Sequence, residues 1–334
     1  MKKLSLILLI LLGACSNQQV VLPLFIYDMQ DAYMADFEEN IRLASPANLP
    51  ILTLDANGSQ IIQNEQIDLQ MKDHEILIIN PVDRLSVFSI IEKAKVYKNK
   101  IIFFNRQPLE SDMQLYDQVY YVGADAVQSA VLQASLIMDL FGNPNKLNAY
   151  DLNQDNSIQV VILKGEQGHQ DAEARTEYVI ASLTDANYHI EVLDIGIANW
   201  DYDSAKQQMD DWMKQYPDQI ELVISNNDVM ALGALDTLKE VKRIDDVNLD
   251  GLLDRNTEPW LPVVGIDGLD AAIESMKQGY LYGTIRNDSI AMANAIIELA
   301  MALQNETSLD SLTTPLTQGQ YIWVNYQKLS LEDE

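Results

Sequence analysis

The sequence predicts an α/β protein made of two doubly wound parallel-sheet domains. Three observations support this fold class: short apolar runs alternate with amphipathic segments, the alternation comes in two successive rounds, and polar residues recur directly after the apolar runs. Strands that alternate with helices form parallel sheets with both faces covered. The chain has 334 residues and is 48% hydrophobic, which is enough for two packed domains.

The N-terminal residues do not belong to the predicted fold. Two lysines precede an apolar run at residues 4–12, which is too short to span a bilayer and is typical of a signal peptide covering residues 1–14. The following "LGAC" resembles a bacterial lipobox, so we expect Cys15 to carry lipid and residues 15–19 to form a tether. Cys15 is the only cysteine, which excludes an internal disulfide.

The first round of the alternation fills residues 20–140. Apolar runs predict strands at 20–27, 49–56, 75–80, 100–105 and 119–125. Amphipathic patterns predict helices at 35–44, 63–72, 87–97 and 126–140.

The second round repeats this order. We expect strands at 158–165, 188–196, 220–227 and 261–267, with helices at 171–185, 204–216 and 229–241. Polar side chains stand just after strands of both rounds, at Asp31, Asn105, His169, Asn227 and Asp267. Ligands of open α/β sheets bind at the carboxyl ends of strands, so these residues predict one cleft between two domains.

The net charge of −28 limits the classes of partner. Nucleic acid and anionic lipid surfaces both require clustered Lys and Arg, so we expect neither to bind the protein. No glycine-rich phosphate loop occurs at a strand–helix turn, which argues against a nucleotide. Acidic loops either keep the protein soluble or bind a cation.

One acidic loop has the spacing of a calcium site. In "DLNQDNSIQ", oxygen-bearing side chains alternate at Asp151, Asn153, Asp155 and Gln159, and Ser157 stands where such loops use a backbone carbonyl. No glutamate follows at the twelfth position, so a distant carboxylate must complete the coordination shell. A solvated acidic loop is the alternative.

A second acidic loop shows similar spacing in "DVNLDGLLD". Its oxygen-bearing residues are Asp246, Asn248, Asp250 and Asp254, and Glu258 follows one position after the expected glutamate. We consider a second cation site and a flexible acidic loop as the two interpretations.

Nine segments, in order, are similar to the family of periplasmic glucose/galactose-binding proteins, the sugar receptors of bacterial ABC importers. They are "IYDMQDAYM", "FFNRQP", "YYVGAD", "DLNQDNSIQ", "KGEQGHQDAEAR", "NWD", "ELVISNND", "VVGIDG" and "GTIRND". The resemblance covers nearly the whole mature chain. It implies the type I periplasmic-binding-protein fold with a three-stranded hinge, crossed near Asp125, Asn287 and Tyr321. The lobes are then 20–125 plus 287–320 and 126–286 plus 321–334.

The resemblance also implies the ligand and its contacts. D-galactose or D-glucose is expected in the cleft, with Asp31 accepting a hydrogen bond from the C4 hydroxyl and with Glu221 completing the calcium shell. Arg106 replaces the usual lysine of the family. The expected sugar-binding residues are Asp31, Tyr33, Asn105, His169, Asp171, Arg175, Trp200, Asn227, Asp267 and Asn287. Carboxylates, amides and guanidinium groups suit paired sugar hydroxyls, and aromatic rings suit the apolar faces of a pyranose.

Other interpretations remain at this point. Asp171 could serve only as a helix N-cap, His169 could lie on a surface loop, and Trp200 could pack in the core. A glycosidase could use Asp31 with Asp171 or Asp267 as its carboxylate pair. Against that, Arg175 stands four residues after Asp171 and is expected to keep that acid ionised, which suits an acceptor better than a proton donor.

The expected protein is therefore a monomeric, lipid-anchored receptor on the extracytoplasmic face of a membrane, and not an enzyme. Its partners would be an ABC permease with its ATPase subunits, with a chemoreceptor as a further candidate. A sugar-responsive repressor shares the fold, but the acidic charge and the absence of room for a DNA-binding domain before the first strand argue against it.

Overall fold

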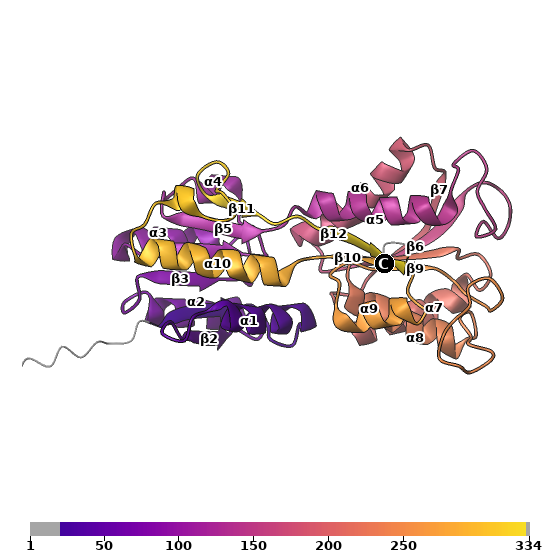
Figure 1. The fold of residues 1–334 in the computed structure, drawn as a ribbon, viewed down its shortest axis with the longest axis horizontal. Coiled ribbons are helices and arrows are strands. Elements are labelled where there is room, and N and C mark those ends of the chain that lie inside the picture. The colour runs from indigo at the N-terminus through magenta and orange to yellow at the C-terminus, as the bar shows by residue number, and fades with distance from the viewer. Residues whose placement is uncertain (1–20, 332–334) are drawn as a thin grey trace, which may run out of the picture.

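The computed structural model describes residues 21–331, which form two lobes side by side along the long axis of the molecule (Figure 1). Each lobe is built on one six-stranded sheet. The predicted signal peptide, the lipid attachment at Cys15 and the tether lie outside the described residues. Among the described helices, none has the length and apolarity needed to cross a membrane.

The N-terminal lobe has an all-parallel sheet in the order β11-β5-β4-β3-β1-β2. Its strands are β1 (Leu22–Ile26), β2 (Ile51–Asp55), β3 (Ile76–Ile79), β4 (Lys100–Phe104), β5 (Val119–Gly123) and β11 (Tyr321–Trp323). One face packs against α1 (Ala32–Ala44) and α10 (Ser289–Gln304). The other face packs against α2 (Gln60–Gln70), α3 (Val87–Tyr97) and the short α4 (Glu110–Met113). A single 3₁₀ turn, η1 (Leu309–Ser311), follows α10.

The C-terminal lobe has the order β12-β10-β9-β8-β6-β7, with only β12 antiparallel. Its strands are β6 (Ile158–Lys164), β7 (Ile190–Ile197), β8 (Leu222–Ser225), β9 (Val263–Val264), β10 (Gly283–Arg286) and β12 (Gln327–Ser330). One face packs against α5 (Ala126–Phe141) and α6 (Gln170–Asp185). The opposite face packs against α7 (Tyr202–Gln215), α8 (Asp228–Glu240) and α9 (Asp270–Lys277).

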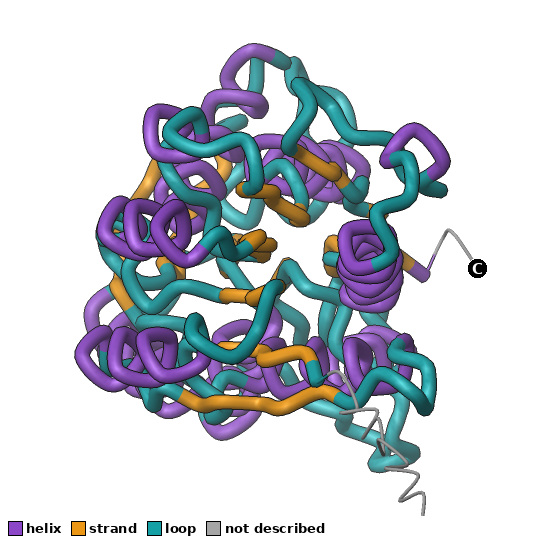
Figure 2. The backbone as a smooth tube through the Cα atoms, turned by 90° about the vertical axis from the view of Figure 1, so that its left-hand side faces the viewer, coloured by secondary structure: helices purple, strands orange, loops and turns teal. Residues whose placement is uncertain are grey.

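The continuous apolar strands explain this layering. Successive side chains of a strand point to opposite faces, so Leu24 enters one core of its lobe and Phe25 enters the other. A strand that is apolar at every position therefore needs a helix layer on both sides, as Figure 2 shows in the view along the long axis. The predicted fold class, two doubly wound parallel domains, is confirmed.

Three chain crossings join the lobes. The first lies between β5 and α5, and the second lies between β10 and α10 at Asn287, both as predicted. The third crossing was predicted near Tyr321, with residues 321–334 assigned to the C-terminal lobe, and that lobe boundary is wrong. Tyr321 pairs with Tyr121 in the N-terminal sheet, so the chain crosses only between Trp323 and Gln327. β11 thus belongs to the N-terminal lobe, and the expected boundary at 321 moves to the segment 324–326.

Candidate functional site

All ten residues expected to bind sugar line one cavity between the lobes, with an empty volume of about 370 Å³ that includes space open to solvent. They come from loops that follow strands of both sheets, from the N-terminal turns of α1 and α6, and from the second crossing. Three further residues line the same cavity, and the sequence analysis did not assign them to the site: Tyr27, Met34 and Arg106.

On the side of the cavity formed by the N-terminal lobe, a helix cap and a left-handed backbone position hold the polar side chains in place. Asp31 is the N-cap of α1, and its Oδ1 accepts hydrogen bonds from the N–H groups of Tyr33 and Met34. This cap holds the carboxylate at the cavity instead of in solvent. Asn105 has a left-handed backbone with φ of 57°, a conformation that Asn tolerates, and its side-chain oxygen accepts a hydrogen bond from Asn80.

Tyr27 and Arg106 complete this wall. The Tyr27 hydroxyl donates a hydrogen bond to Asp31 Oδ2, and the Arg106 guanidinium lies 3.8 Å from the centre of the Tyr27 ring. Burial and the Asp31 carboxylate raise the pKa of Tyr27, so its hydroxyl stays protonated. Tyr27 directly follows β1, and this position after a strand was the signal that could have identified it.

His169 is the N-cap of α6, which corrects the alternative that gave Asp171 that role. The backbone N–H of Asp171 donates to Nδ1 of His169. Burial is the largest cause that lowers the pKa of His169 well below its usual value, and the positive charges of nearby arginines lower it further, so the ring is neutral. Its proton then sits on Nε2, which makes His169 a hydrogen-bond donor at the cavity. With 8% exposure, His169 is not a surface loop residue.

Arg175 is a buried cation of the site, with 3% exposure. It donates to the carbonyl of Asn226 at 2.7 Å and to the hydroxyl of Tyr326 at 3.0 Å. Its guanidinium lies 3.4 Å from Asp171 and 3.8 Å from Asp267. Its Nε is buried and has no hydrogen-bond partner among the described residues.

The two carboxylates beside Arg175 are both buried. Burial raises the pKa of Asp171 and outweighs the lowering by Arg175, so the arginine does not hold this acid below its usual range. Burial also raises the pKa of Asp267 well above its usual value. Burial therefore opposes the effect of Arg175 that was expected to keep Asp171 ionised.

Trp200 forms the aromatic part of the C-terminal wall. Its ring packs edge-on against His169 at 5.2 Å, and its backbone is left-handed with φ of 66°. A Cβ atom at Gly165 would come within 2.2 Å of the Trp200 ring, so only glycine leaves space for the ring. Nδ2 of Asn227 reaches the Trp200 carbonyl at 3.5 Å, while its oxygen caps α8.

Asp267 and Asn287 lie side by side at the hinge, where Asn287 N–H donates to the Asp267 carbonyl. Asp267 has φ of 128°, a strained value for a residue with a side chain. The buried carboxylate of Asp228 holds this turn through the N–H groups of Gly268 and Leu269. Oδ1 of Asn287 is buried, and no residue in the range 21–331 gives it a hydrogen bond.

The loop predicted to bind calcium is closed around a buried glutamate. Oε1 of Glu221 accepts hydrogen bonds from the N–H groups of Leu152 and Asn153, and Oε2 accepts one from Gln159. Oδ1 of Asp151 and Oε1 of Gln159 are buried and have no hydrogen-bond partner in the part of the chain that the structure describes. Such orphaned oxygens are what a hard cation requires.

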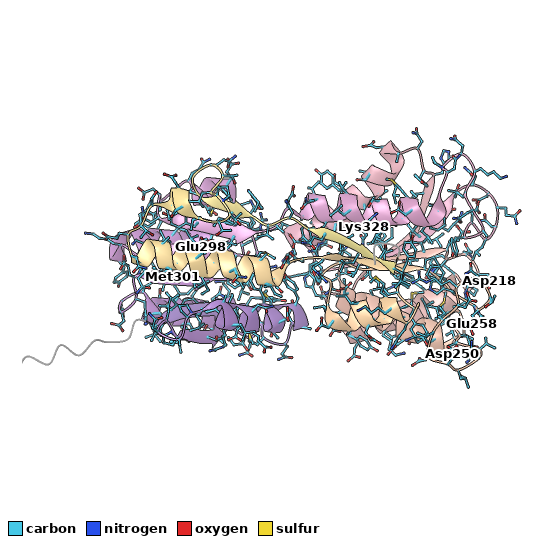
Figure 3. All side chains as sticks on the ribbon, viewed as in Figure 1. Asp218, Asp250, Glu258, Glu298, Met301 and Lys328 are labelled. Carbon is cyan, nitrogen blue, oxygen red and sulfur yellow. The ribbon has the colours of Figure 1, made fainter. Side chains whose placement is uncertain are left out.

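The second acidic loop repeats this hydrogen-bond pattern. Glu258 accepts from the N–H groups of Val247, Asn248 and Asp254, as Glu221 does in the first loop. Asp250 and Glu258 lie together at the end of the C-terminal lobe that is remote from the other lobe (Figure 3). The described residues include no group of three or more His, Cys, Asp or Glu side chains arranged around one metal position.

Comparison with known proteins places this geometry among binding proteins. The periplasmic binding protein domain model matches residues 22–307. The D-galactose/methyl-galactoside binding periplasmic protein MglB of Haemophilus influenzae is 36% identical over 280 residues, which are 82% of this chain and 78% of that protein.

Solved structures share the fold at lower identity. A solute binding protein of Bacillus halodurans with bound myo-inositol has a TM-score of 0.74 at 24% identity, covering 94% of this chain and 96% of that one. Another from Actinobacillus succinogenes, with bound D-allose, has a TM-score of 0.76 at 18% identity, covering 94% and 98%.

Proposed function

The chain belongs to the periplasmic binding protein family, and from this premise we propose that it binds a monosaccharide between its lobes and delivers it to an ABC permease. Membership in this family implies a location outside the cytoplasm. The 36% identity to a galactose/methyl-galactoside binding protein supports D-galactose and D-glucose as the ligands.

One observation carries this proposal: the ten residues chosen from sequence meet at a single cavity. The cavity combines carboxylate and carbonyl acceptors with imidazole and guanidinium donors, which suits the alternating hydroxyls of a pyranose. Trp200 and Tyr33 supply aromatic rings for its C–H faces. Arg175 Nε and Asn287 Oδ1 are buried without partners, so each is free to bond a ligand hydroxyl.

The mechanism is a closure of the two lobes around the sugar. Asp31 and Asn105 contact the ligand from one lobe, whereas His169 and Arg175 contact it from the other. The ligand therefore binds the closed form more tightly than the open form and shifts the population toward it. The three crossings provide the hinge for this movement.

Titration calorimetry with a panel of monosaccharides tests the proposal. We expect D-galactose and D-glucose to bind one molecule per chain, and Asn287→Ala to abolish binding because it removes the buried amide. Asn294→Ala is the matched control, since Asn294 is exposed on α10 outside the cavity. Failure of every monosaccharide to bind the wild-type chain refutes the proposal.

We propose that calcium occupies the 151–159 loop and ties it to β8. Asp151, Asn153, Asp155, Ser157 and Gln159 would hold it together with Glu221. The unpartnered oxygens of Asp151 and Gln159 support this proposal. The ion would supply structural rigidity and take no part in sugar contacts.

The second loop carries no comparable orphaned oxygen, so its cation site stays a prediction. Its candidate ligands, Asp246, Asn248, Asp250 and Asp254, are partly or fully exposed. Calorimetric calcium counting on the wild type and on Asp250→Asn decides it: a drop from two ions to one supports the site, and one ion in both removes it.

We further propose that lipid on Cys15 anchors the protein, and that it acts as a receptor without hydrolysing glycosides. Mass spectrometry of the mature N-terminus tests the anchor. Release of nitrophenol from an aryl galactoside by the purified protein would contradict the receptor proposal and favour the carboxylate pair as catalytic. Docking to a chemoreceptor is compatible with the same closed form.

A further inference from the structure

Arg106 makes three contacts at once, and they connect both lobes. Its Nη1 donates to the carbonyl of Val82 at 2.6 Å in its own lobe. Its Nη2 forms an ion pair at 3.0 Å with Glu166, which follows β6 in the other lobe. The flat guanidinium also covers the Tyr27 ring at 3.8 Å.

Tyr27 links Arg106 to Asp31 at the cavity. Its hydroxyl donates to Oδ2 of Asp31, while Oδ1 accepts the two N–H groups that it caps in α1. Both oxygens of Asp31 are thus held by the protein, which fixes the direction in which each can accept a further hydrogen bond. Glu166, Arg106, Tyr27 and Asp31 form one continuous series of contacts across the cleft.

We propose that Arg106 is a positioning residue that couples lobe closure to the orientation of Asp31, with Glu166 as its latch on the opposite lobe. The inference rests on the proposed function only in that Asp31 contacts the ligand. Opening the cleft separates Glu166 from Arg106 and leaves the guanidinium with its two contacts in the N-terminal lobe. Closure restores the third contact.

The chemistry explains why a guanidinium serves here. Arginine stacks its plane on an aromatic ring and still directs separate N–H groups to two acceptors, which a single ammonium group cannot do with the same geometry. Another hydrogen bond across the cleft, from Gln170 Nε2 to the carbonyl of Asn105, is longer at 3.4 Å. The charged pair is therefore the stronger of these two cross-cleft contacts.

Glu166→Gln removes the latch charge with little risk to folding, because the Glu166 side chain is half exposed. We expect the dissociation constants of D-galactose and D-glucose to rise by the same factor, about fivefold, as is reasonable for a partly exposed ion pair. The change should appear in the dissociation rate. The dependence of wild-type affinity on ionic strength should also weaken in this variant.

Glu240→Gln is the matched control. Glu240 pairs with Lys206 at 2.7 Å within the C-terminal lobe, is exposed, and lies outside the cavity. The same substitution there should leave the sugar affinity and its salt dependence unchanged.

Tyr27→Phe tests the orientation of the Asp31 carboxylate separately from the closure of the lobes. Phenylalanine keeps the ring that Arg106 covers but frees Oδ2 of Asp31. We expect the ratio of galactose to glucose affinity to change by a factor of two or more, because the two sugars present their C4 hydroxyls in different directions, while the salt dependence persists. A purely structural role for Tyr27 would weaken both sugars equally.

Small-angle scattering of the sugar-free protein tests the latch independently of the ligand. High salt should increase the radius of gyration of the wild type but not of Glu166→Gln, which should already be expanded. The proposal is overturned if Glu166→Gln matches Glu240→Gln in scattering. It is also overturned if sugars bind but Tyr27→Phe leaves their affinity ratio unchanged. If no sugar binds the wild type, the proposed function fails and scattering alone decides the latch.

Discussion

Asp228 is a buried acid whose replacement by asparagine should stabilise the protein at neutral pH. One of its oxygens accepts the N–H groups of Gly268 and Leu269, and the other accepts the hydroxyl of Thr284 at 2.7 Å. An asparagine can keep all three bonds, since its oxygen can accept both N–H groups and its amide can donate to Thr284. Asp228→Asn therefore removes a buried charge while keeping three hydrogen bonds at this position.

The magnitude follows from the pKa. Burial raises the pKa of Asp228 from 3.8 to about 6, although its hydrogen bonds lower it. The folded state thus binds the proton more tightly than the unfolded state, so stability falls as pH rises through this window and is constant above it. A tenfold difference in proton affinity corresponds to about 1.4 kcal/mol, which makes the loss about 3 kcal/mol at pH 7.

Urea unfolding of the wild type and Asp228→Asn at pH 4 and pH 7, followed by circular dichroism, measures this difference. The variant should be more stable by up to about 3 kcal/mol at pH 7 and nearly equal to the wild type at pH 4. Sugar affinity should persist, because the turn that carries Asp267 keeps its anchor. An equal gain at both pH values, or a loss at both, would refute the electrostatic reasoning.

Three further predictions concern the Trp200 ring, the Arg175 guanidinium and the proposed calcium ion. Gly165→Ala places a Cβ within 2.2 Å of the Trp200 ring, so calorimetry should show the sugar dissociation constant raised at least about tenfold. Gly196→Ala is the control: it crowds side chains outside the cavity and should lower only the melting temperature. Arg175→Met leaves two buried carboxylates without their cation, so urea unfolding should show a loss of about 3–5 kcal/mol, and sugar binding should disappear; full stability would contradict the ion-pair assignment. Chelation of calcium should lower the melting temperature, with a free-energy loss of about 3 kcal/mol if calcium was present at a hundred times its dissociation constant, and Asp151→Asn should abolish the response to chelator.

The sequence by itself determined the fold class and most of the site. Strand and helix periodicity is local, and a polar residue after a buried strand has to emerge at the carboxyl edge of its sheet. Asp31, Asn105 and Asp267 could therefore be placed at the carboxyl edges of the two sheets before their contacts were known. The calcium-loop spacing was local in the same way.

Tertiary structure alone decided the contacts between distant parts of the chain. Arg106 and Glu166 are 60 residues apart and meet only because the lobes face each other across the cleft. Tyr321 follows no local signal that assigns it to either sheet, and its lobe is set by pairing with Tyr121. The raised pKa of Asp171 likewise depends on burial in the folded protein, which outweighs the arginine one helical turn away. Periodicity reports the neighbours along the chain, whereas burial and charge pairing depend on surfaces that the folded lobes bring together.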